Sequence, residues 1–401
     1  MYLRRNSLRK TLARILLVVL VLFSTVEVLH VRQSLARAEG DSTAVHAPGP
    51  ERIFIAGIFW NNEAILRSSL NAALVDLVEH LGPHNVFISV HESGSWDNTK
   101  DALRELDEAF ERIGADRRIT TSNATHLDEI SVESKGEGWV DTPQGQREMR
   151  RIPYLAKQRN IGLEPLAELA ERGVQFEKVL FINDVVFSTE DALQLLDTNG
   201  GEYAAACSMD FKNPPYFYDT FALRDSEGNE HLMPTWPYFR SRVSRDAMSR
   251  YVPVPVSSCW NGMVAMPAQV FTGPSALRFR GIPDSLAAAH LEGSECCLIH
   301  ADNPFSRSKG VFVNPRVRVG YTSEAYEAMR NGEVTLSSII IGLRLWENRI
   351  RRWTTTPMLK TRAVASRLQR WYEDDPTNEE PGGFCLINEM QVLRKIGWAH
   401  V

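Results

Sequence analysis

The sequence predicts an α/β fold in which a mostly parallel sheet is flanked by helices, together with an amino-terminal membrane anchor. Two observations predict the sheet. Short apolar runs alternate with helical patterns from residue 52 onward, and this alternation is typical of βαβ units. Polar clusters follow directly after the apolar runs, where α/β proteins place their ligands. A third observation, basic residues followed by an apolar run at the amino terminus, predicts the anchor.

Composition limits the classes of protein to which the chain can belong. Its 401 residues are 43% hydrophobic and 24% charged, which is enough to bury a large core in one main domain with appendages. The 45 Lys and Arg residues against 50 Asp and Glu residues give a net charge of -5, and no long basic stripe crosses the central region. A nucleic-acid partner is therefore not expected.

The cysteines are few and widely spaced, and they include no Cys-x-x-Cys pair. An odd, scattered set argues against a zinc site and against a disulfide scaffold, although it is compatible with one or two disulfides. The five positions are Cys207, Cys259, Cys296, Cys297 and Cys385.

The amino terminus predicts where the protein resides. Basic residues between Arg4 and Arg14 precede an apolar run that continues, less purely toward its end, to Val31. We expect residues 1–14 to form a cytosolic tail, residues 15–31 a signal-anchor helix and residues 32–51 a stem. The sequence Ala36-Arg37-Ala38 resembles a signal-peptidase site, so a cleaved signal peptide is the rival interpretation. The long basic head favours the anchor.

The first elements of the domain follow in order from their apolar spacing. Residues 52–59 form a run short enough for a buried strand, and residues 61–78 continue with the spacing of a helix. Residues 85–90 and 98–113 repeat the strand and helix patterns. Parallel sheets bind ligands at the carboxyl ends of their strands, so the polar residues that follow these two strands are expected at the functional edge.

Glu92 opens a polar segment that follows the second predicted strand and ends at Thr99. A carboxylate at this place can accept hydrogen bonds from a nucleobase or a ribose, and Asp97 can lie near the same loop. The alternative is a plain loop in which Asp97, Asn98 and Thr99 cap the next helix. We predict that Glu92 and Asp97 bind a nucleotide.

The segment that contains Lys157, Arg159 and Asn160 supplies groups that suit phosphates. The planar fork of an arginine can bind two phosphate oxygens at once, and lysine adds a compact charge. On a solvated helix the same residues would have no such role. We predict that these three residues bind the diphosphate of a nucleotide donor.

Asn183 and Asp184 directly follow the apolar run Val179–Ile182, and a second apolar run comes after them. An unpaired carboxylate near a core is costly, so Asp184 is expected to have a cation as its partner. Magnesium or manganese suits a hard oxygen ligand and would bridge the donor diphosphate. The alternative is that Asp184 caps the helix expected at Thr189–Leu196.

Five motifs in combination resemble the fungal capsule-associated α-1,3-mannosyltransferases, glycosyltransferase family 69. They are residues 61–63, 92–99, 181–185, 207–211 and 217–225. The resemblance covers residues 52–322 and implies a single GT-A-like, Rossmann-related α/β domain, which leaves residues 323–401 as a helical extension. It also implies GDP-mannose as donor, manganese or magnesium as cofactor, and a single-pass type II protein of the Golgi membrane with a lumenal catalytic domain.

Within the wider GT-A pattern, Glu92 resembles the acidic residue near the nucleoside, and Asn183-Asp184 resembles the D-x-D metal motif. The chain departs from that motif because Asn183 precedes a single aspartate and Val185 follows it. It therefore supplies one strong metal ligand, Asp184.

Acceptor-binding and catalytic residues are expected after the metal motif. A dense polar and aromatic group between residues 210 and 225 has the composition that binds sugars by stacking and hydrogen bonds, although a loop closing over the donor would look the same. Glu295 resembles the acidic helix start that faces the acceptor in GT-A enzymes, or it is a first-turn charge favoured by the helix dipole. The predicted acceptor-binding residues are Asp210, Tyr218, Arg224, Asp225, Trp260 and Asn261, and the predicted catalytic residues are Asp184, Asp219 and Glu295.

The extension is predicted to begin with a helix. Residues 336–353 are basic and aromatic enough to lie on an anionic membrane surface, but we expect this helix to pack on the domain. Residues 374–383 are predicted to be a linker.

The predicted function is transfer of a mannosyl residue from GDP-mannose to a glycan acceptor, with an α-1,3 linkage, retention of configuration and metal assistance. One alternative is a lumenal carbohydrate-binding or degenerate protein without transfer activity, which would need neither Asp184 nor phosphate-binding cations. Another is a glycan hydrolase, which would need two carboxylates at a defined separation. The presence of the acid and the cations favours the transferase.

Overall fold

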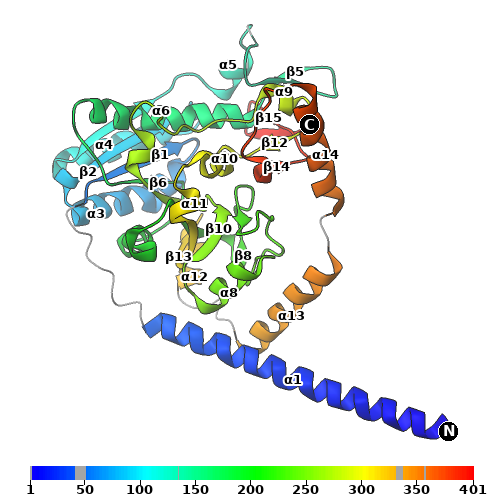
Figure 1. The fold of residues 1–401 in the computed structure, drawn as a ribbon. Helices are drawn as coiled ribbons and strands as arrows, with labels where there is room; N and C mark the ends of the chain where they lie inside the picture. Colours follow the sequence, from blue (N-terminus) through cyan, green and yellow to red (C-terminus); the bar gives the residue numbers. More distant parts are fainter. Residues whose placement is uncertain (1, 41–50, 134, 331–336, 356–357) are drawn as a thin grey trace.

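The domain is built on one ten-stranded sheet (Figure 1). This computed structural model describes residues 2–40, 51–133, 135–330, 337–355 and 358–401. The strand order is β3-β2-β1-β6-β11-β7-β13-β10-β9, and β8 pairs with β7. The strands of this sheet are β1 (Ile53–Phe59), β2 (Val86–Glu92), β3 (Asp116–Thr121), β6 (Lys178–Ile182), β7 (Ala205–Asn213), β8 (Tyr216–Phe217), β9 (Arg224–Asp225), β10 (Val254–Ser258), β11 (Met263–Pro267) and β13 (Val311–Gly320).

The strand directions confirm the predicted fold class. Strands β3, β2, β1 and β6 are parallel to one another, and β13 is parallel to β7. Strand β11 is antiparallel to both β6 and β7, so a single reversed strand separates two parallel groups. This is the mostly parallel, GT-A-like sheet, and its antiparallel edge is completed by β10 and β9.

The early elements lie where the apolar spacing predicts them. Strand β1 corresponds to the first predicted run, and β2 ends at Glu92, which is its last residue. The helix predicted at residues 189–196 is observed with the same bounds, and its amino terminus is capped by Ser188 and Asp191 in a capping box. Asp184 is therefore not the cap of that helix.

Helices cover both faces of the sheet. Side chains of β1 alternate between two hydrophobic cores, with Ile53, Ile55 and Phe59 in one and Phe54 and Ala56 in the other. The first core also contains apolar side chains of α3, α4 and α7, and the second contains those of α6 and α10. The helices of the domain are α2 (Glu63–Ile65), α3 (Asn71–Leu81), α4 (Thr99–Ile113), α5 (His126–Ile130), α6 (Arg151–Glu171), α7 (Thr189–Leu196), α8 (Arg242–Arg250), α9 (Asp284–Ala287), α10 (Glu295–Asp302), α11 (Ser306–Lys309) and α12 (Ser323–Arg330), and a π-helical segment (Leu66–Leu70) joins α2 to α3.

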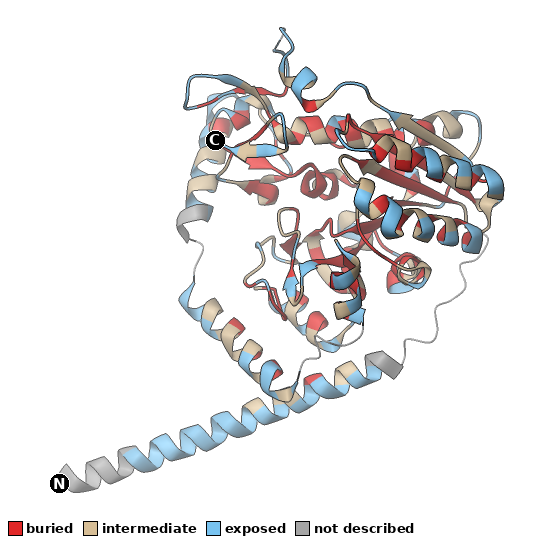
Figure 2. Ribbon diagram, turned by 180° about the vertical axis from the view of Figure 1, so that it is seen from behind, coloured by how far each residue is buried: buried red, intermediate tan, exposed pale blue. Residues whose placement is uncertain are grey.

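The amino-terminal helix α1 (Tyr2–Gly40) extends away from the domain (Figure 1). Its segment Lys10–Arg37 has a mean hydropathy of 2.4 and is long and apolar enough to cross a membrane. Most of its side chains from residue 10 to residue 23 are exposed, as the pale-blue helix in Figure 2 shows. These properties fit a single membrane anchor. Residues 32–40, which we expected in the stem, continue the helix, and residues 41–50 lie outside the described residues, so the stem remains a prediction.

Helix α13 (Ser338–Thr354) packs beside the second half of α1. The Arg349 guanidinium forms an ion pair with Glu27 at 2.9 Å, and the indole N–H of Trp346 donates to the Ser24 hydroxyl at 2.8 Å. Asn348, which is buried, donates to the backbone oxygen of Phe239 at 3.2 Å. The helix thus contacts both the domain, as expected, and the predicted anchor.

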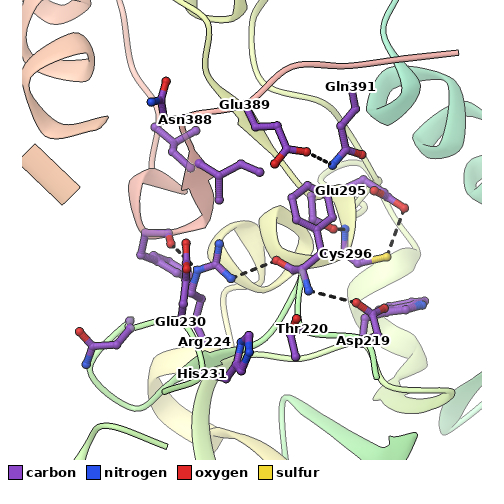
Figure 3. Close-up of a pocket in the computed structure, with 18 of the residues that line it drawn as sticks. Asp219, Thr220, Arg224, Glu230, His231, Glu295, Cys296, Asn388, Glu389 and Gln391 are labelled. Atoms are coloured by element: carbon purple, nitrogen blue, oxygen red, sulfur yellow. Dashed lines mark hydrogen bonds between the residues drawn. The ribbon is translucent and has the colours of Figure 1, made fainter. Parts of the chain in front are cut away.

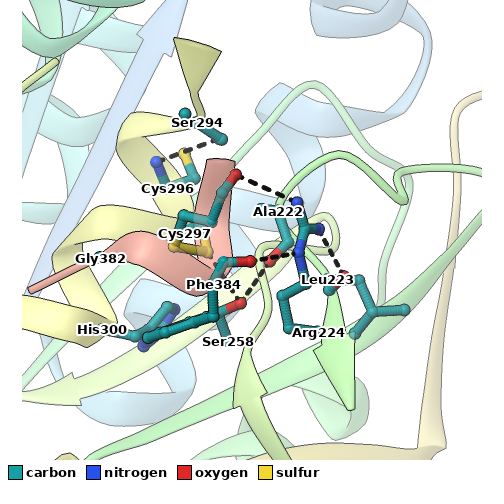
Figure 4. Close-up of a disulfide and its surroundings, with 12 residues drawn as sticks. Ala222, Leu223, Arg224, Ser258, Ser294, Cys296, Cys297, His300, Gly382 and Phe384 are labelled. Carbon is teal, nitrogen blue, oxygen red and sulfur yellow. Dashed lines mark hydrogen bonds between the residues drawn. A yellow bond between two sulfur atoms is a disulfide. The ribbon is translucent and has the colours of Figure 1, made fainter. Parts of the chain in front are cut away.

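The rest of the extension returns to the domain and is fixed there. Helix α14 (Met358–Asp374) is followed by the predicted linker and by three short strands. A disulfide between Cys297 and Cys385 joins this segment to α10, close to the buried side chains that Figure 4 labels. A second disulfide joins Cys207 to Cys259, and Cys296 is a buried free thiol. The remaining short strands are β4 (Trp139–Asp141), β5 (Arg147–Met149), β12 (Glu292–Gly293), β14 (Leu386–Ile387), β15 (Gln391–Leu393) and β16 (Trp398–His400).

Candidate active site

A cavity of about 1060 Å³ lies at the carboxyl edge of the sheet. Asn183 follows β6 and Tyr321 follows β13, so both come from the ends of parallel strands. Trp260 precedes β11, and it reaches the same edge because β11 runs in the opposite direction. Glu295 enters the cavity from the first turn of α10. Trp260 therefore meets Asn183 and Tyr321 at one edge of the sheet because the strand that follows it runs in the opposite direction to theirs.

Two aspartates form the centre of a hydrogen-bonded cluster beside this cavity. Asp210 lies near the end of β7 and is completely buried. Its Oδ1 accepts from the amide nitrogen of Asn261 at 3.1 Å and from the backbone N–H of Asp219 at 3.2 Å. Its Oδ2 accepts from the hydroxyl of Tyr321 at 3.0 Å. The same Asn261 amide donates to the backbone oxygen of Asp219 at 2.6 Å, so one side chain holds both aspartates in place.

The electrostatics of the cluster favour neutral carboxyls. Burial raises the pKa of Asp210, and the nearby charge of Asp219 raises it further. Burial also raises the pKa of Asp219, where Glu295 adds to the effect and the guanidinium groups of Arg151 and Arg159 oppose it. The pKa of Tyr321 is raised in turn by burial and by the surrounding acids. The cluster thus carries more carboxylates than its neighbouring cations neutralise, a pattern that is frequent at functional sites.

Asp184 lies at the same edge, half-buried in the turn after β6. Its Oδ2 accepts from the amide nitrogen of Asn62 at 2.9 Å. Burial raises the pKa of Asp184, although the bond from Asn62 opposes the shift. The neighbouring Asn183 side chain lines the cavity, and its oxygen is 3.4 Å from the indole nitrogen of Trp260.

The loop before β11 is held in a conformation that requires glycine. Gly262 has a φ of +80°, and a Cβ at this position would lie 2.4 Å from the Val319 side chain. The Ser208 hydroxyl donates to the backbone oxygen of Asn261 and accepts from the backbone N–H of Met263, which fixes both ends of the turn. Because the turn is fixed, Asn261 is oriented toward the two aspartates.

Glu295 forms an ion pair with Arg159, which in turn lies over the ring of Trp260. Its Oε1 accepts from Arg159 at 3.1 Å, and the Cys296 thiol donates to the same oxygen at 3.3 Å. The Arg159 guanidinium lies 4.6 Å from the centre of the Trp260 ring, a distance typical of cation–π contacts. Figure 3 shows Glu295 and Cys296 above the cavity that Asp219 enters from below. Arg159 therefore positions Glu295 and lines the cavity at the same time.

The residues at this edge fit a divalent cation. Asp184 forms no ion pair with a basic side chain of the described residues, and a hard cation prefers carboxylate and amide oxygens. The Oδ1 of Asn261 is buried without a hydrogen-bond partner, so an oxygen acceptor beside the aspartates is left free. Asp184 and Asn183 would hold the ion at one side, with donor phosphates and water as its other ligands, as is usual for magnesium.

Cys207, Cys259 and His300 lie close enough to bind a metal by distance alone. The two cysteines are joined in a disulfide, so they provide no thiolate for an ion.

The predicted nucleotide-binding acids lie at the neighbouring strand end. Glu92 is fully buried and accepts from the backbone N–H groups of Ser95 and Ser122, with Lys100 at 3.9 Å. Asp97 accepts at 3.0 Å from the backbone N–H of Thr99, the first residue of α4, and so satisfies a backbone donor at the start of that helix, although the N-cap position itself is Asn98. Neither acid lines the large cavity.

Four other predicted residues serve mainly structural contacts. The exposed Lys157 faces Glu129 at 3.6 Å, and Asn160 forms two hydrogen bonds with the backbone of Phe279. Arg224 lines the cavity but donates to backbone oxygens, including those of Phe384 and Cys385. Asp225 accepts from the backbone N–H groups of Ser241, Glu227 and Asn229.

The structure thus separates the predicted residues into two groups. Those that line the cavity or bond to its lining are Asn183, Asp210, Tyr218, Asp219, Arg159, Arg224, Asp225, Trp260, Asn261 and Glu295. Those that it places elsewhere are Glu92, Asp97, Lys157, Asn160 and Asp184, of which Asp184 directly follows the lining residue Asn183 and bonds to Asn62.

Sequence reasoning missed two contributors to the cavity near the acids. Arg151 is the first residue of α6, and Tyr321 directly follows β13. It also missed the carboxyl-terminal residues from 383 to 400 that line the opposite side. Figure 3 shows Asn388, Glu389 and Gln391 along this side, with Thr220 and His231 along the other. Trp398 and His400 were visible as polar-aromatic residues, but no local pattern links them to α10.

Together, the reversed strand within a parallel sheet and the acids at its carboxyl edge define a protein with a GT-A-like glycosyltransferase fold. The family model described as cryptococcal mannosyltransferase 1 matches residues 52–302. The chain therefore belongs to this family.

A relative of known name is the alpha-1,3-mannosyltransferase CMT1 of Cryptococcus neoformans. The chain is 28% identical to it over an alignment 281 residues long, which covers 65% of this chain and 55% of the relative. The match thus spans little more than half of the relative's length.

Two solved structures are similar over most of the chain. One is the mannosyltransferase of Pyrobaculum calidifontis with GDP-Man and Mn²⁺, at 12% identity over 90% of this chain and 88% of that one, with a TM-score of 0.34. The other is TarS of S. aureus (residues 1–349), at 13% identity over 82% of this chain and 73% of that one, also with a TM-score of 0.34. Similarity at this level carries no information about the substrate of this chain.

Proposed function

We propose that the protein transfers a mannosyl residue from GDP-mannose to a glycan acceptor, with a divalent metal, manganese or magnesium, as cofactor. The observation that carries the proposal is the cluster of incompletely neutralised acids at the carboxyl edge of the sheet, beside a cavity large enough for a sugar donor and acceptor. Family membership and the name of the cryptococcal relative support mannose as the transferred sugar.

The donor is proposed to occupy the edge from β2 to β6. Glu92 and Asp97 stand at the nucleoside end, where Glu92 fixes the loop through two backbone N–H groups. Arg159 lies next to Asn183 in the lining of the cavity and is the cation best placed for the donor phosphates. Lys157 and Asn160 are further proposed contacts, but their observed partners lie on other parts of the fold.

When bound, the divalent ion would neutralise charge on the departing diphosphate. Asp184 would hold that ion directly, and the weaker amide ligand Asn183 would assist. Asn62 orients Asp184 through its hydrogen bond, and Asn261 orients Asp210 and Asp219. The chain thus keeps its acids in place before the substrate arrives, which reduces the reorganisation needed during transfer.

The product is proposed to be an α-1,3 linkage formed with retention, because the mannose of the donor is α-linked to phosphate. A phosphate oxygen of the donor can then take the proton of the acceptor hydroxyl, and no protein base is strictly required. The Glu295 carboxylate is engaged by Arg159 and Cys296, which suits a group that positions the acceptor. Asp219 enters the same cavity, and Tyr218 and Trp260 supply aromatic surface.

The cellular site proposed for this activity is the Golgi membrane, with α1 as a single type II span and the domain in the lumen. The basic residues that precede the apolar run support this orientation, since they favour the cytosolic side.

A panel of sugar nucleotides tests the proposal. The full chain, purified in detergent, is incubated with each donor and a mixture of mannose and mannose oligosaccharides, and released nucleotide is measured. We expect acceptor-dependent release of GDP from GDP-mannose, loss of that release in EDTA, and its recovery with Mn²⁺ or Mg²⁺. Release from another sugar nucleotide alone, or full activity in EDTA, would contradict the proposed donor or the metal.

A further inference from the structure

Residues near the carboxyl terminus line one side of the cavity. They lie outside residues 52–302, which the family model matches. We call residues 386–400 the carboxyl-terminal wall. The members that line the cavity include Asn388, Glu389, Gln391, Trp398 and His400.

Several contacts fix the wall to the domain next to the acids. Strand β14 pairs with β12, which directly precedes α10 and Glu295. The disulfide between Cys297 and Cys385 crosslinks the segment to α10 itself (Figure 4). Within the hairpin, β15 pairs with β16, and Val392, which is fully buried, bridges to Arg150. The wall is therefore a fixed part of the cavity.

The lining side chains of the wall follow the alternation of a strand. Trp398 and His400 are two residues apart on β16 and both line the cavity, while Ala399 between them does not. Trp398 is 41% exposed, which is high for a tryptophan, although the Arg151 guanidinium lies over its ring and the His400 ring meets it in a T-shaped contact at 4.6 Å. An exposed aromatic ring in a cavity offers a stacking surface for the apolar face of a sugar.

Polar groups that suit hydroxyls surround this ring. Gln391 accepts from Arg151 at 2.6 Å and donates to Glu389 at 2.8 Å. Glu389 also forms an ion pair with His400. The two ionisable side chains of the wall that line the cavity, Glu389 and His400, therefore contact each other, which favours an uncharged ligand over an ionic one.

Arg151 connects the wall to the acids. Its guanidinium lies 4.5 Å from the centre of the Trp398 ring, and it interacts electrostatically with Glu295 and Asp219. A ligand that extends from the acids past Arg151 would therefore reach Trp398 within one continuous cavity.

From this arrangement we infer that the carboxyl-terminal wall is a subsite for a neutral oligosaccharide acceptor, and that Trp398 stacks on a sugar next to the one that is glycosylated. The inference rests on the proposed function and deepens it, because it assigns the acceptor a length of at least two sugars. The reacting sugar lies near Asp219 and Glu295, and its neighbour lies against the wall.

The test compares acceptors of increasing length with GDP-mannose as donor. For the full-chain protein we expect kcat/KM to be at least about tenfold higher with α-1,3-linked mannobiose or mannotriose than with mannose. Trp398→Ala should remove most of this advantage by raising the KM for the oligosaccharides, with a smaller change in kcat/KM for mannose. Trp398→Phe, which keeps an aromatic face, should retain part of the advantage.

Trp353→Ala is the matched control, because Trp353 is also exposed but lies on α13 and does not line the cavity. It should change neither value. An equal kcat/KM for all acceptors in the wild-type protein, no use of either oligosaccharide, or an unchanged length preference in Trp398→Ala would overturn the inference. If Trp398→Ala fails to fold, a length preference in Trp398→Phe equal to that of the wild type would overturn it.

Failure of the proposed function has a different signature. In that case the wild-type protein would transfer mannose to none of the acceptors and release no GDP, whereas failure of this inference leaves transfer intact.

Discussion

Two groups of buried acids in this protein differ in how their charge is neutralised. Next to α10, Glu292 accepts two hydrogen bonds from Arg150, at 3.1 and 2.7 Å, and Asp284 binds the same guanidinium at 2.7 Å. Around the cavity, the Asp210 carboxyl accepts from the Asn261 amide and the backbone N–H of Asp219, and the Asp219 carboxyl accepts from the backbone N–H of Phe221. Neither forms an ion pair with a described basic side chain. The acids of the first group therefore have a guanidinium partner within the protein, and those of the second group have none among the described residues.

This difference indicates that the acids bound to Arg150 stabilise the fold, and that the acids around the cavity are available to bind a cation. A carboxylate that already has a matched guanidinium gains nothing from a further cation, and removing its partner leaves a buried charge. Burial raises the pKa of Glu292 as well as those of Asp184, Asp210 and Asp219, so the groups differ in the guanidinium that faces Glu292 and not in the direction of the shift. Crowded carboxylates without such a partner would be stabilised by a divalent ion. We therefore expect substitutions in the first group to lower the stability of the fold, and substitutions in the second group to change its dependence on pH and on metal.

The largest effect on stability is expected from Arg150→Met. Arg150 and Glu292 are both fully buried, so the change leaves an unpaired carboxylate in the core. We expect the free energy of unfolding to fall by about 3–5 kcal/mol, measured by denaturant unfolding of the purified protein. The control is Arg118→Met, which breaks an exposed pair with Glu168 and should cost less than about 1 kcal/mol. Equal losses in the two variants would show that the buried pair is not structural.

A smaller, pH-dependent effect is expected from Asp210→Asn. Because the pKa of Asp210 is raised in the folded protein, ionisation destabilises the metal-free fold as pH rises above the ordinary aspartate range near about 4. An asparagine can keep the two bonds to Oδ1 and can donate to Tyr321, whose hydroxyl then accepts.

In EDTA, we therefore expect Asp210→Asn to be more stable than the wild type at pH 8, by on the order of 1 kcal/mol, and this advantage to shrink at pH 5. Thermal unfolding at the two pH values measures the difference. An advantage that is greater at pH 5 than at pH 8 would have the wrong sign for a raised pKa.

The smallest effect is expected from Lys157→Ala. The side chain of Lys157 is 61% exposed, and it faces Glu129 and not the cavity. We expect the KM for GDP-mannose to change by less than about twofold, because an exposed ion pair contributes little. Arg159→Met, which removes a cation from the cavity lining, is the comparison and should raise that KM by more. A larger rise in the KM for GDP-mannose in Lys157→Ala would instead indicate that Lys157 binds the donor phosphates.

Much of the fold could be predicted from local pattern. The spacing of apolar residues placed β1, β2, α4, β6 and α7 within a few residues of their observed bounds. The same reasoning placed Asn183 and Asp184 at the end of a buried strand, as observed. These successes have one cause, because strand and helix periods are properties of short segments.

The composition of the site could be predicted less completely, because it depends on contacts between distant segments. Asp210, Asp219 and Asn261 were predicted singly, but their mutual hydrogen bonds depend on the reversal of β11 and on the turn at Gly262. The role of Trp398 depends on a disulfide whose pairing no spacing reveals. Lys157 was predicted from residue type alone, which does not determine the direction of a side chain on a helix.

The central claim is that the acids at the edge of the sheet hold a divalent cation together with the donor diphosphate, and Asp184 tests it most directly. Titration calorimetry of Mn²⁺ into the full-chain protein, with GDP present, measures this binding without any transfer reaction. We predict that Asp184→Asn weakens Mn²⁺ binding by about 100-fold or more with the fold preserved, because loss of even an indirect partner of a metal costs about 10- to 100-fold. Asp225→Asn changes an acid that is held by backbone N–H groups and does not itself line the cavity, so this variant should bind Mn²⁺ as the wild type does. Equal Mn²⁺ affinity in the wild type and Asp184→Asn would contradict the account.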